Sequence, residues 1–270
     1  MQGHLRLAWL SVFEAARAPG PVAWCASDRP ILLLPGFVSS PRTLAPMERS
    51  LRRHLGRPTL RVDLGGGWRD IRDSACEMYE LLDGQLHRSG VRRLDVVAHS
   101  MGGLVAAYLL KCVDHGRHIR RLVTLGTPHR GVPLARLPGP AWLCPSVRQM
   151  RPGSAFLRHL ARLPLPDGCE LVSIAGGRDT LVPPDAARVA EQPGQETRLV
   201  AAADHCDLLL CPEARAAVRR ALLRGVATEP SLGQGPIRRS APAPVARPAR
   251  LAAARSHAQR GGSSERSSTA

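Results

Sequence analysis

One serine in this chain has neighbours that suggest chemistry. Ser100 follows a short, mostly apolar run, residues 94–97, and precedes a segment in which apolar side chains recur at helical spacing. The pentapeptide fits the pattern G-x-S-x-G, with alanine for the first glycine: Ala98-His99-Ser100-Met101-Gly102. A buried strand that turns sharply into a helix holds such a hydroxyl above the edge of a sheet, where it acts as a nucleophile. A serine that only caps the helix is the alternative, but the agreement of strand, turn and helix favours the nucleophile.

This segment resembles the nucleophile elbow of the α/β-hydrolase lipases and esterases, above all small bacterial lipases with the same alanine. The resemblance extends over roughly residues 30–223. It implies the α/β-hydrolase fold, a mostly parallel, doubly wound sheet flanked by helices, with a small helical cap inserted. It also implies an oxyanion hole formed by the backbone N–H groups of Met101, next to the nucleophile, and of Phe37. Pro35 stands where the family usually has a histidine before the glycine.

A serine nucleophile needs a base that takes its proton and a carboxylate that orients this base. In the family these partners follow in the order Ser, Asp, His, and Asp179 and His205 satisfy that order. Residues 177–183 resemble the family's acid loop, although an aspartate that only caps its own turn is the alternative for Asp179. Asp204 and Asp207 compete as acids, but they are so close to His205 in sequence that neither is well placed to orient its ring.

His129 competes with His205 as the base. It lies in a phrase that is also similar to lipases, near their acyl site: Gly126-Thr127-Pro128-His129-Arg130-Gly131. Its place directly after a predicted strand favours a role in structuring that loop, and it precedes the acid. His257 lies in the terminal tail. His205 is therefore the predicted base.

Predicted strands and helices alternate along the chain, which indicates a parallel sheet covered on both faces. Strands are expected at residues 31–34, 59–64, before Ser100, and at 121–125, 170–175 and 197–202. Helices are expected to open at residues 39–41, to span 70–88, to follow Ser100, and to run from Pro212 to about Leu223. Glycines 65–67 lack the G-x-G-x-x-G pattern of nucleotide sites and are expected to form a tight loop beside the active site. Sites in such sheets lie at the carboxyl ends of the strands, and the three candidate catalytic residues each follow a strand.

Composition divides the chain into three parts. Residues 1–27 are expected to form an amphipathic helix and a linker; the helix packs on the domain or, alternatively, rests on a membrane surface. Residues 28–227 are expected to form the catalytic domain, in which the Pro- and Gly-rich segment 132–167 supplies short cap helices. Residues 228–270 are rich in Arg, Pro, Ala and Ser and are expected to be disordered.

The chain has a net charge of +16, and Lys111 is the only lysine among its 38 basic residues. A basic chain suits binding to nucleic acid or to an anionic membrane, but aromatic residues make up only 3%, which argues against nucleic acid.

Seven scattered cysteines without C-x-x-C spacing argue against a zinc site or a disulfide framework. No run of about eighteen apolar residues predicts a membrane span, and charged residues interrupt the apolar start of the chain. A cytoplasmic location with peripheral membrane contact is therefore expected rather than secretion.

These observations predict an enzyme that cleaves carboxylic esters, of lipid or other acyl type, through a Ser100–Asp179–His205 triad and an acyl-enzyme, with no metal or organic cofactor. Two alternatives stay open. The same triad also serves acyltransferases and amide hydrolases. A non-catalytic protein that binds anionic surfaces through its basic tail is the alternative from another class. The sequence leaves the oligomeric state undetermined.

Overall fold

The computed structural model describes residues 24–26, 28–133 and 143–224, and the fold below refers to these residues. The expected N-terminal helix within residues 1–27, the middle of the expected cap and the expected tail 228–270 lie outside the described residues. They stay predictions.

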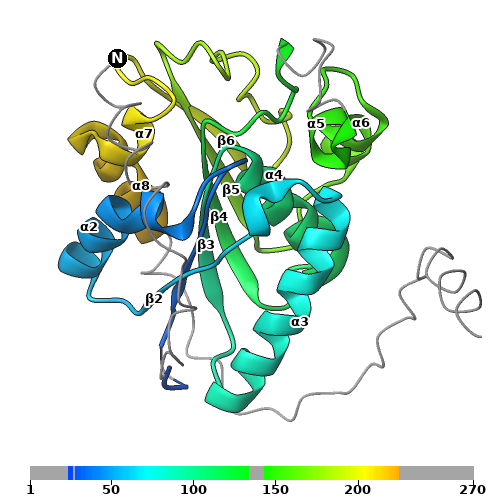
Figure 1. Ribbon diagram of the computed structural model, residues 1–270. Coiled ribbons are helices and arrows are strands. Elements are labelled where there is room, and N and C mark those ends of the chain that lie inside the picture. Colours follow the sequence, from blue (N-terminus) through cyan, green and yellow to red (C-terminus); the bar gives the residue numbers. More distant parts are fainter. Residues whose placement is uncertain (1–23, 27, 134–142, 225–270) are drawn as a thin grey trace, which may run out of the picture. The chain divides into compact units, whose positions relative to one another are not determined.

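A six-stranded parallel sheet lies at the centre of the described chain, in the order β2-β1-β3-β4-β5-β6 (Figure 1). Its strands are β1 Ile31–Leu34, β2 Thr59–Arg61, β3 Leu94–His99, β4 Ile119–Leu125, β5 Glu170–Gly176 and β6 Gln195–Val200. Every pairing of neighbouring strands is parallel, which confirms the predicted doubly wound sheet. The strand order reverses beside β1, and ligands of such sheets bind at this reversal, outside the carboxyl ends of the strands.

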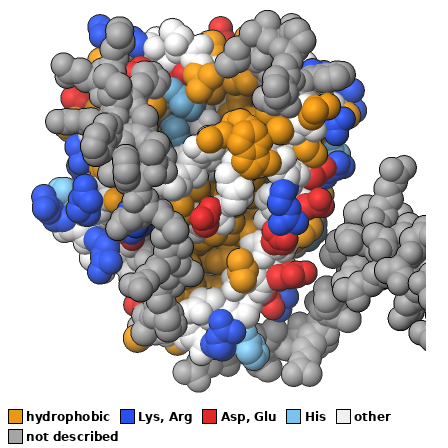
Figure 2. Space-filling view, in the orientation of Figure 1, with side chains coloured by type: hydrophobic (Ala, Val, Ile, Leu, Met, Phe, Trp, Pro, Cys, Tyr) orange, Lys and Arg blue, Asp and Glu red, His pale blue; other side chains and the backbone are white. Residues whose placement is uncertain are grey.

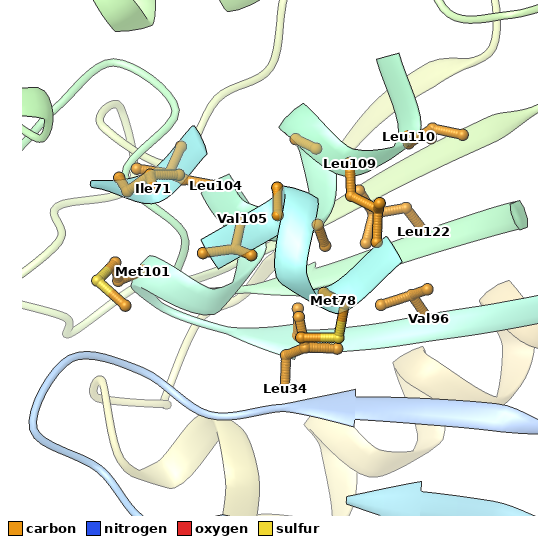
Figure 3. Close-up of a cluster of buried hydrophobic side chains, with 14 of the residues drawn as sticks. Leu34, Ile71, Met78, Val96, Met101, Leu104, Val105, Leu109, Leu110 and Leu122 are labelled. Atoms are coloured by element: carbon orange, nitrogen blue, oxygen red, sulfur yellow. The ribbon is translucent and has the colours of Figure 1, made fainter. Parts of the chain in front are cut away.

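Helices cover both faces of the sheet, because the strands are apolar on both sides. On one face lie α2 Ala45–Leu55, the short α7 Asp207–Leu210 and α8 Pro212–Leu223. On the other lie α3 Ile71–Ser89, α4 Met101–Tyr108, α5 Pro145–Gln149 and α6 Ala155–Arg162. Figure 3 shows the core beneath α3 and α4, where Leu34 and Val96 of the sheet pack with Met78. The apolar side chains that recur at helical spacing along α3 are all buried in this core: Ile71, Ala75, Met78, Leu82 and Leu86.

A fully buried carboxylate interrupts the apolar central strand. Asp95 of β3 lies 3.1 Å from the guanidinium nitrogen Nη2 of Arg29 and 2.6 Å from that of Arg57. The two arginines offset the cost of burying the Asp95 carboxylate. Removing either partner of a buried ion pair leaves the other charge unpaired. The ion pairs tie the segment before β1 and the loop before β2 to the amino end of β3.

Several element boundaries differ from the sequence prediction; β4, for example, begins at Ile119 rather than at residue 121. β2 ends at Arg61 rather than at residue 64, because the chain turns there into a 3-10 helix, Gly65–Gly67. β6 begins two residues earlier than expected: it is an edge strand whose polar Gln195, Glu196 and Arg198 hide its start from an apolar pattern. α4 continues as a π-helix, Leu109–Asp114, which the apolar spacing does not distinguish from an α-helix. Among the described residues, no helix is long and apolar enough to cross a membrane.

Candidate active site

Ser100 forms the turn between β3 and α4 in a conformation that is strained for any residue with a side chain. Its φ is +54° and its ψ is −127°, and such backbone strain persists only where neighbours hold it in place. Its N–H donates to the carbonyl oxygen of Leu125 at 2.8 Å. Its own carbonyl accepts hydrogen bonds from Thr127 Oγ1 at 2.9 Å and from the Gly103 N–H at 3.0 Å. The strand, sharp turn and helix that the sequence predicts around this serine are therefore all present.

Two glycines allow the loop after β1 to lie against this turn. A Cβ atom on Gly102 would lie 2.2 Å from the carbonyl oxygen of Pro35, closer than any side chain tolerates. A Cβ atom on Gly36 would lie 3.0 Å from the Cβ of Ser100. The start of α4 and the loop after β1 are thus in direct contact beside the serine.

The predicted oxyanion donors lie on these two segments. Among the described residues, neither the N–H of Phe37 nor that of Met101 donates a hydrogen bond to a protein acceptor. The loop that carries Phe37 is fixed by the N–H of Val38, which donates to the carbonyl of Gly66 at 2.8 Å. The ring of Phe37 packs edge-on against Trp68, with 4.8 Å between the ring centroids. The glycine run before Trp68 thus forms a tight loop beside the predicted site.

Asp179 and His205 form a buried hydrogen-bonded pair after β5 and β6. His205 Nδ1 lies 2.7 Å from Asp179 Oδ2, and the side chains are 7% and 0% exposed, respectively. The other oxygen, Oδ1, accepts the N–H groups of Leu181 at 3.0 Å and Val182 at 2.7 Å. One carboxylate therefore caps its own turn and binds the imidazole, and the role of Asp179 as the acid stays a prediction.

The competing acids have other partners. Asp204 Oδ1 accepts the N–H groups of Cys206 at 2.8 Å and Asp207 at 2.7 Å. Asp207 Oδ2 in turn accepts the N–H of Asp204 at 3.3 Å. These two carboxylates close the turn that leads into α7.

The competing base, His129, lies in a structural hydrogen bond. Its Nε2 is 3.0 Å from the hydroxyl oxygen of Thr124 in β4. Removal of its ring from water lowers the pKa of His129 to about 3, because burial disfavours the charged imidazolium. The ring is thus uncharged at neutral pH and bound to its own strand. His257 lies outside the described residues.

The sequence prediction missed two residues that contact the site. Thr127 holds the carbonyl of Ser100, as described above. His99 is buried, and its Nε2 lies 3.0 Å from the backbone oxygen of His205. Both residues occur in motifs quoted from the sequence. His99 is the variable residue before the serine in the G-x-S-x-G pattern, and Thr127 lies in residues 126–131 after β4. The chemistry requires no particular residue type at either position.

A pocket of about 470 Å³ lies between the start of α3 and the helices α5 and α6, which fall within the segment expected to form a cap. Tyr108, Gln149 and Phe156 line it together with charged residues, but Ser100, Asp179 and His205 do not. The buried amide of Gln149 joins α5 to α3, since its Oε1 accepts the Ile71 N–H at 2.8 Å. Within the described residues, no three His, Cys, Asp or Glu side chains converge as metal ligands.

Comparisons with known proteins place this geometry among known folds. The family model described as "PGAP1-like alpha/beta domain" matches residues 73–224, more than half of the chain and the part that holds Ser100, Asp179 and His205.

Solved structures with a similar fold include two lipases. Lipase B of Aspergillus fumigatus has a TM-score of 0.61 and 16% identity, over 74% of this chain and 54% of that one. The mature lipase BlEst2 of Bacillus licheniformis has a TM-score of 0.57 and 17% identity, over 77% and 94% of the two chains. The product of gene lin2722 from Listeria innocua has a TM-score of 0.57 and 15% identity, over 73% and 95%. At such identities the likeness establishes the fold alone.

Proposed function

Since this chain belongs to the PGAP1-like alpha/beta domain family and has the α/β-hydrolase fold, we propose that it is a serine hydrolase that cleaves carboxylic esters. One observation carries the proposal: the strained Ser100 turn and the buried Asp179–His205 pair both lie at the carboxyl ends of the strands. A serine on such a turn and a histidine oriented by a buried carboxylate are the parts that nucleophilic acyl transfer requires.

The reaction proceeds in two steps. The Oγ atom of Ser100 attacks the acyl carbonyl while His205 takes its proton, and Asp179 stabilises the imidazolium that forms. The Phe37 and Met101 N–H groups and the positive end of α4 stabilise the oxyanion. The alcohol leaves with the proton from His205. A water molecule then gives a proton to His205 and attacks the acyl carbon. The bond to Oγ breaks, His205 returns its proton to Oγ, and the acid is released.

Apolar side chains around the site support a lipid or other acyl ester as the substrate. Val38 is 56% exposed, Trp68 48% and Leu181 39%, although each is a large hydrophobic residue. Val38 follows Phe37, Trp68 packs on Phe37, and Leu181 lies two residues after Asp179. Figure 2 shows hydrophobic side chains at the end of the sheet where β1 ends. Exposed apolar groups of this kind suit contact with acyl chains. The proposal also includes peripheral contact with a membrane and a cytoplasmic location.

The proposal is tested with p-nitrophenyl esters of increasing acyl length and a fluorophosphonate probe, on the wild type and on Ser100→Ala. We expect turnover and labelling of Ser100 in the wild type, and neither in the variant. Absence of both turnover and labelling in the folded wild type would overturn the proposal. Release of p-nitrophenol with the acyl group recovered on an added alcohol or amine would assign the triad to an acyltransferase instead.

A further inference from the structure

His99, the residue before Ser100, contacts His205 in two ways although their elements are not neighbours. β4 and β5 separate β3 from β6 in the sheet. The Nε2 atom of His99 nevertheless lies 3.0 Å from the backbone oxygen of His205, and the centroids of the two rings are 4.6 Å apart. The turn that carries the nucleophile is therefore bound directly to the residue that carries the base.

The geometry fixes the protonation of His99. A carbonyl oxygen only accepts hydrogen bonds, so Nε2 carries the hydrogen. Burial and the neighbouring His205 ring lower the pKa of His99 to about 3, and a neutral ring has only this one N–H. The other nitrogen, Nδ1, is buried without a hydrogen-bond partner among the described residues. A charged His99 would place a second N–H at this position, where no acceptor is present.

We propose that His99 is a positioning residue: as a neutral Nε2–H donor, it holds the backbone of His205 so that the imidazole bound to Asp179 meets Ser100. This inference rests on the proposed function. The hydrogen bond to Asp179 fixes the ring of His205 at one nitrogen, and the bond from His99 fixes the same residue at its main chain. A histidine held by two hydrogen bonds rotates less than one held by a single bond. This matters because misplacement of a reacting group by about 1 Å costs as much as a hundredfold in rate.

The neutrality of His99 matters because His205 becomes positively charged during the reaction. A second positive charge at this distance would oppose protonation of His205 and lower its strength as a base. An arginine or lysine would donate to the carbonyl but would add that charge. A leucine would fill the space but would leave the buried carbonyl unpaired. Only an uncharged donor both pairs the His205 carbonyl and avoids a second positive charge beside the His205 ring.

The test compares His99→Leu with His99→Gln in the full-length protein, on a short-chain ester. The glutamine amide extends about as far as Nε2 and donates without charge. We expect His99→Leu to lower kcat roughly ten- to a hundredfold with little change in KM, and His99→Gln to recover most of the loss. His129→Leu is the matched control, because it removes another histidine with a pKa of about 3, which is partly buried and bound to Thr124 instead. We expect its kcat to be unchanged.

A second measurement is independent of turnover. We expect the His205 Nδ1 proton, bound to the Asp179 carboxylate at 2.7 Å, to give a far-downfield proton NMR signal in the wild type. We expect His99→Leu to weaken or shift this signal and His129→Leu to leave it unchanged. If the wild type neither turns over nor labels, the proposed function fails, but this signal still tests the positioning.

A folded His99→Leu with wild-type kcat and an unchanged signal would overturn the inference. So would a His99→Gln variant as impaired as His99→Leu. If the leucine variant does not fold, His99→Asn replaces it, because the shorter amide cannot reach the His205 carbonyl. Equal activity of His99→Asn and His99→Gln would then contradict a role for that hydrogen bond.

Discussion

The carboxylate of Asp179 binds Nδ1 of His205 through one oxygen, at 2.7 Å, and the backbone of its own turn through the other. The same side chain therefore builds the loop after β5 and orients the histidine that follows β6. Because both contacts are made by a fully buried group, the proposed acid is in position before any substrate arrives. This preorganisation distinguishes Asp179 from the two carboxylates beside His205 in the sequence.

Asp179→Asn should lower kcat/KM on a short-chain ester on the order of a thousandfold or more. A neutral amide no longer stabilises the imidazolium and favours the wrong tautomer of His205. Asp204→Asn is the matched control, since it removes one charge isosterically from a carboxylate that accepts the Cys206 and Asp207 N–H groups. Its effect should be much smaller.

Circular dichroism must show that both variants are folded. If Asp204→Asn is the more damaging change, Asp204 is the acid and Asp179 serves only its turn. Equal and mild effects would indicate that Ser100 and His205 act without a dedicated carboxylate.

Ser100→Gly should be more stable than Ser100→Ala by about 1 kcal/mol, although both variants should be inactive. A φ of +54° with a ψ of −127° is strained by about 1–3 kcal/mol for a residue with a Cβ atom. Glycine relieves this strain and loses part of the gain through the entropy of its unfolded chain. Urea denaturation of the two variants measures the difference. An alanine variant as stable as the glycine variant would show that the turn is relaxed.

The sequence predicted the parts of this fold that rest on strong local patterns. The helical spacing of Ile71, Met78 and Leu82 predicts α3 and its buried face. The apolar run before Ser100 predicts the central strand. β6 was misplaced because it is an edge strand, where burial imposes no apolar pattern on Glu196 and Arg198.

Asp179 and His205, whose side chains pair in the structure, were predictable because the chemistry specifies both a residue type and an order. His99 and Thr127 were not, because their contacts join segments far apart in the sequence. A histidine that donates to a carbonyl 106 positions away has no signature in its own neighbourhood. Only the folded chain, in which the loop after β6 reaches past β4 and β5 to the end of β3, reveals such a contact.

Gly102→Ala should destabilise the protein by about 1–3 kcal/mol, because the new methyl group overlaps the Pro35 carbonyl oxygen. Activity should fall as well, since the overlap separates Phe37 from Met101. Gly84→Ala is the control inside α3, where a Cβ atom would meet only the flexible end of Arg88, at 3.3 Å. Alanine favours a helix over glycine, so this variant should gain about 0.5–1 kcal/mol. Loss of stability in Gly84→Ala but not in Gly102→Ala would contradict the close packing of α4 on the loop after β1.

Two histidines with lowered pKa values should make the folded protein sensitive to acid. Burial lowers the pKa values of His99 and His129 to about 3 from 6.5. Between these values the unfolded chain binds protons at these rings and the folded chain does not. Their contribution to stability is therefore fully present above pH 6.5 and is lost as the pH falls towards 3.

His129→Gln removes one of these groups. Its free energy of unfolding should fall less steeply with acidification than that of the wild type, by up to about 1.4 kcal/mol per pH unit. Urea denaturation at several pH values between 6.5 and 4.5 measures both slopes. Parallel slopes would mean that the His129 ring titrates normally in the folded protein.

Trp68→Ala should reduce kcat/KM on long-chain esters more than on p-nitrophenyl acetate. The indole is 48% exposed and packs edge-on against Phe37, so an acyl chain in this position would bury it further. Loss of an aromatic contact of about 1.4 kcal/mol corresponds to a tenfold change in the ratio of the two rates. A fall on both esters alike would instead mean that Trp68 only supports the loop after β1 that carries Phe37.

The control for this prediction is Leu223→Ala. Leu223 is 57% exposed, but it ends α8, where the Leu222 carbonyl accepts a hydrogen bond from Arg121 at the amino end of β4. That end of the sheet is opposite the proposed site, so this variant should leave the ratio unchanged. Equal ratios in Trp68→Ala and Leu223→Ala would remove the support that Trp68 gives to a lipid or acyl substrate.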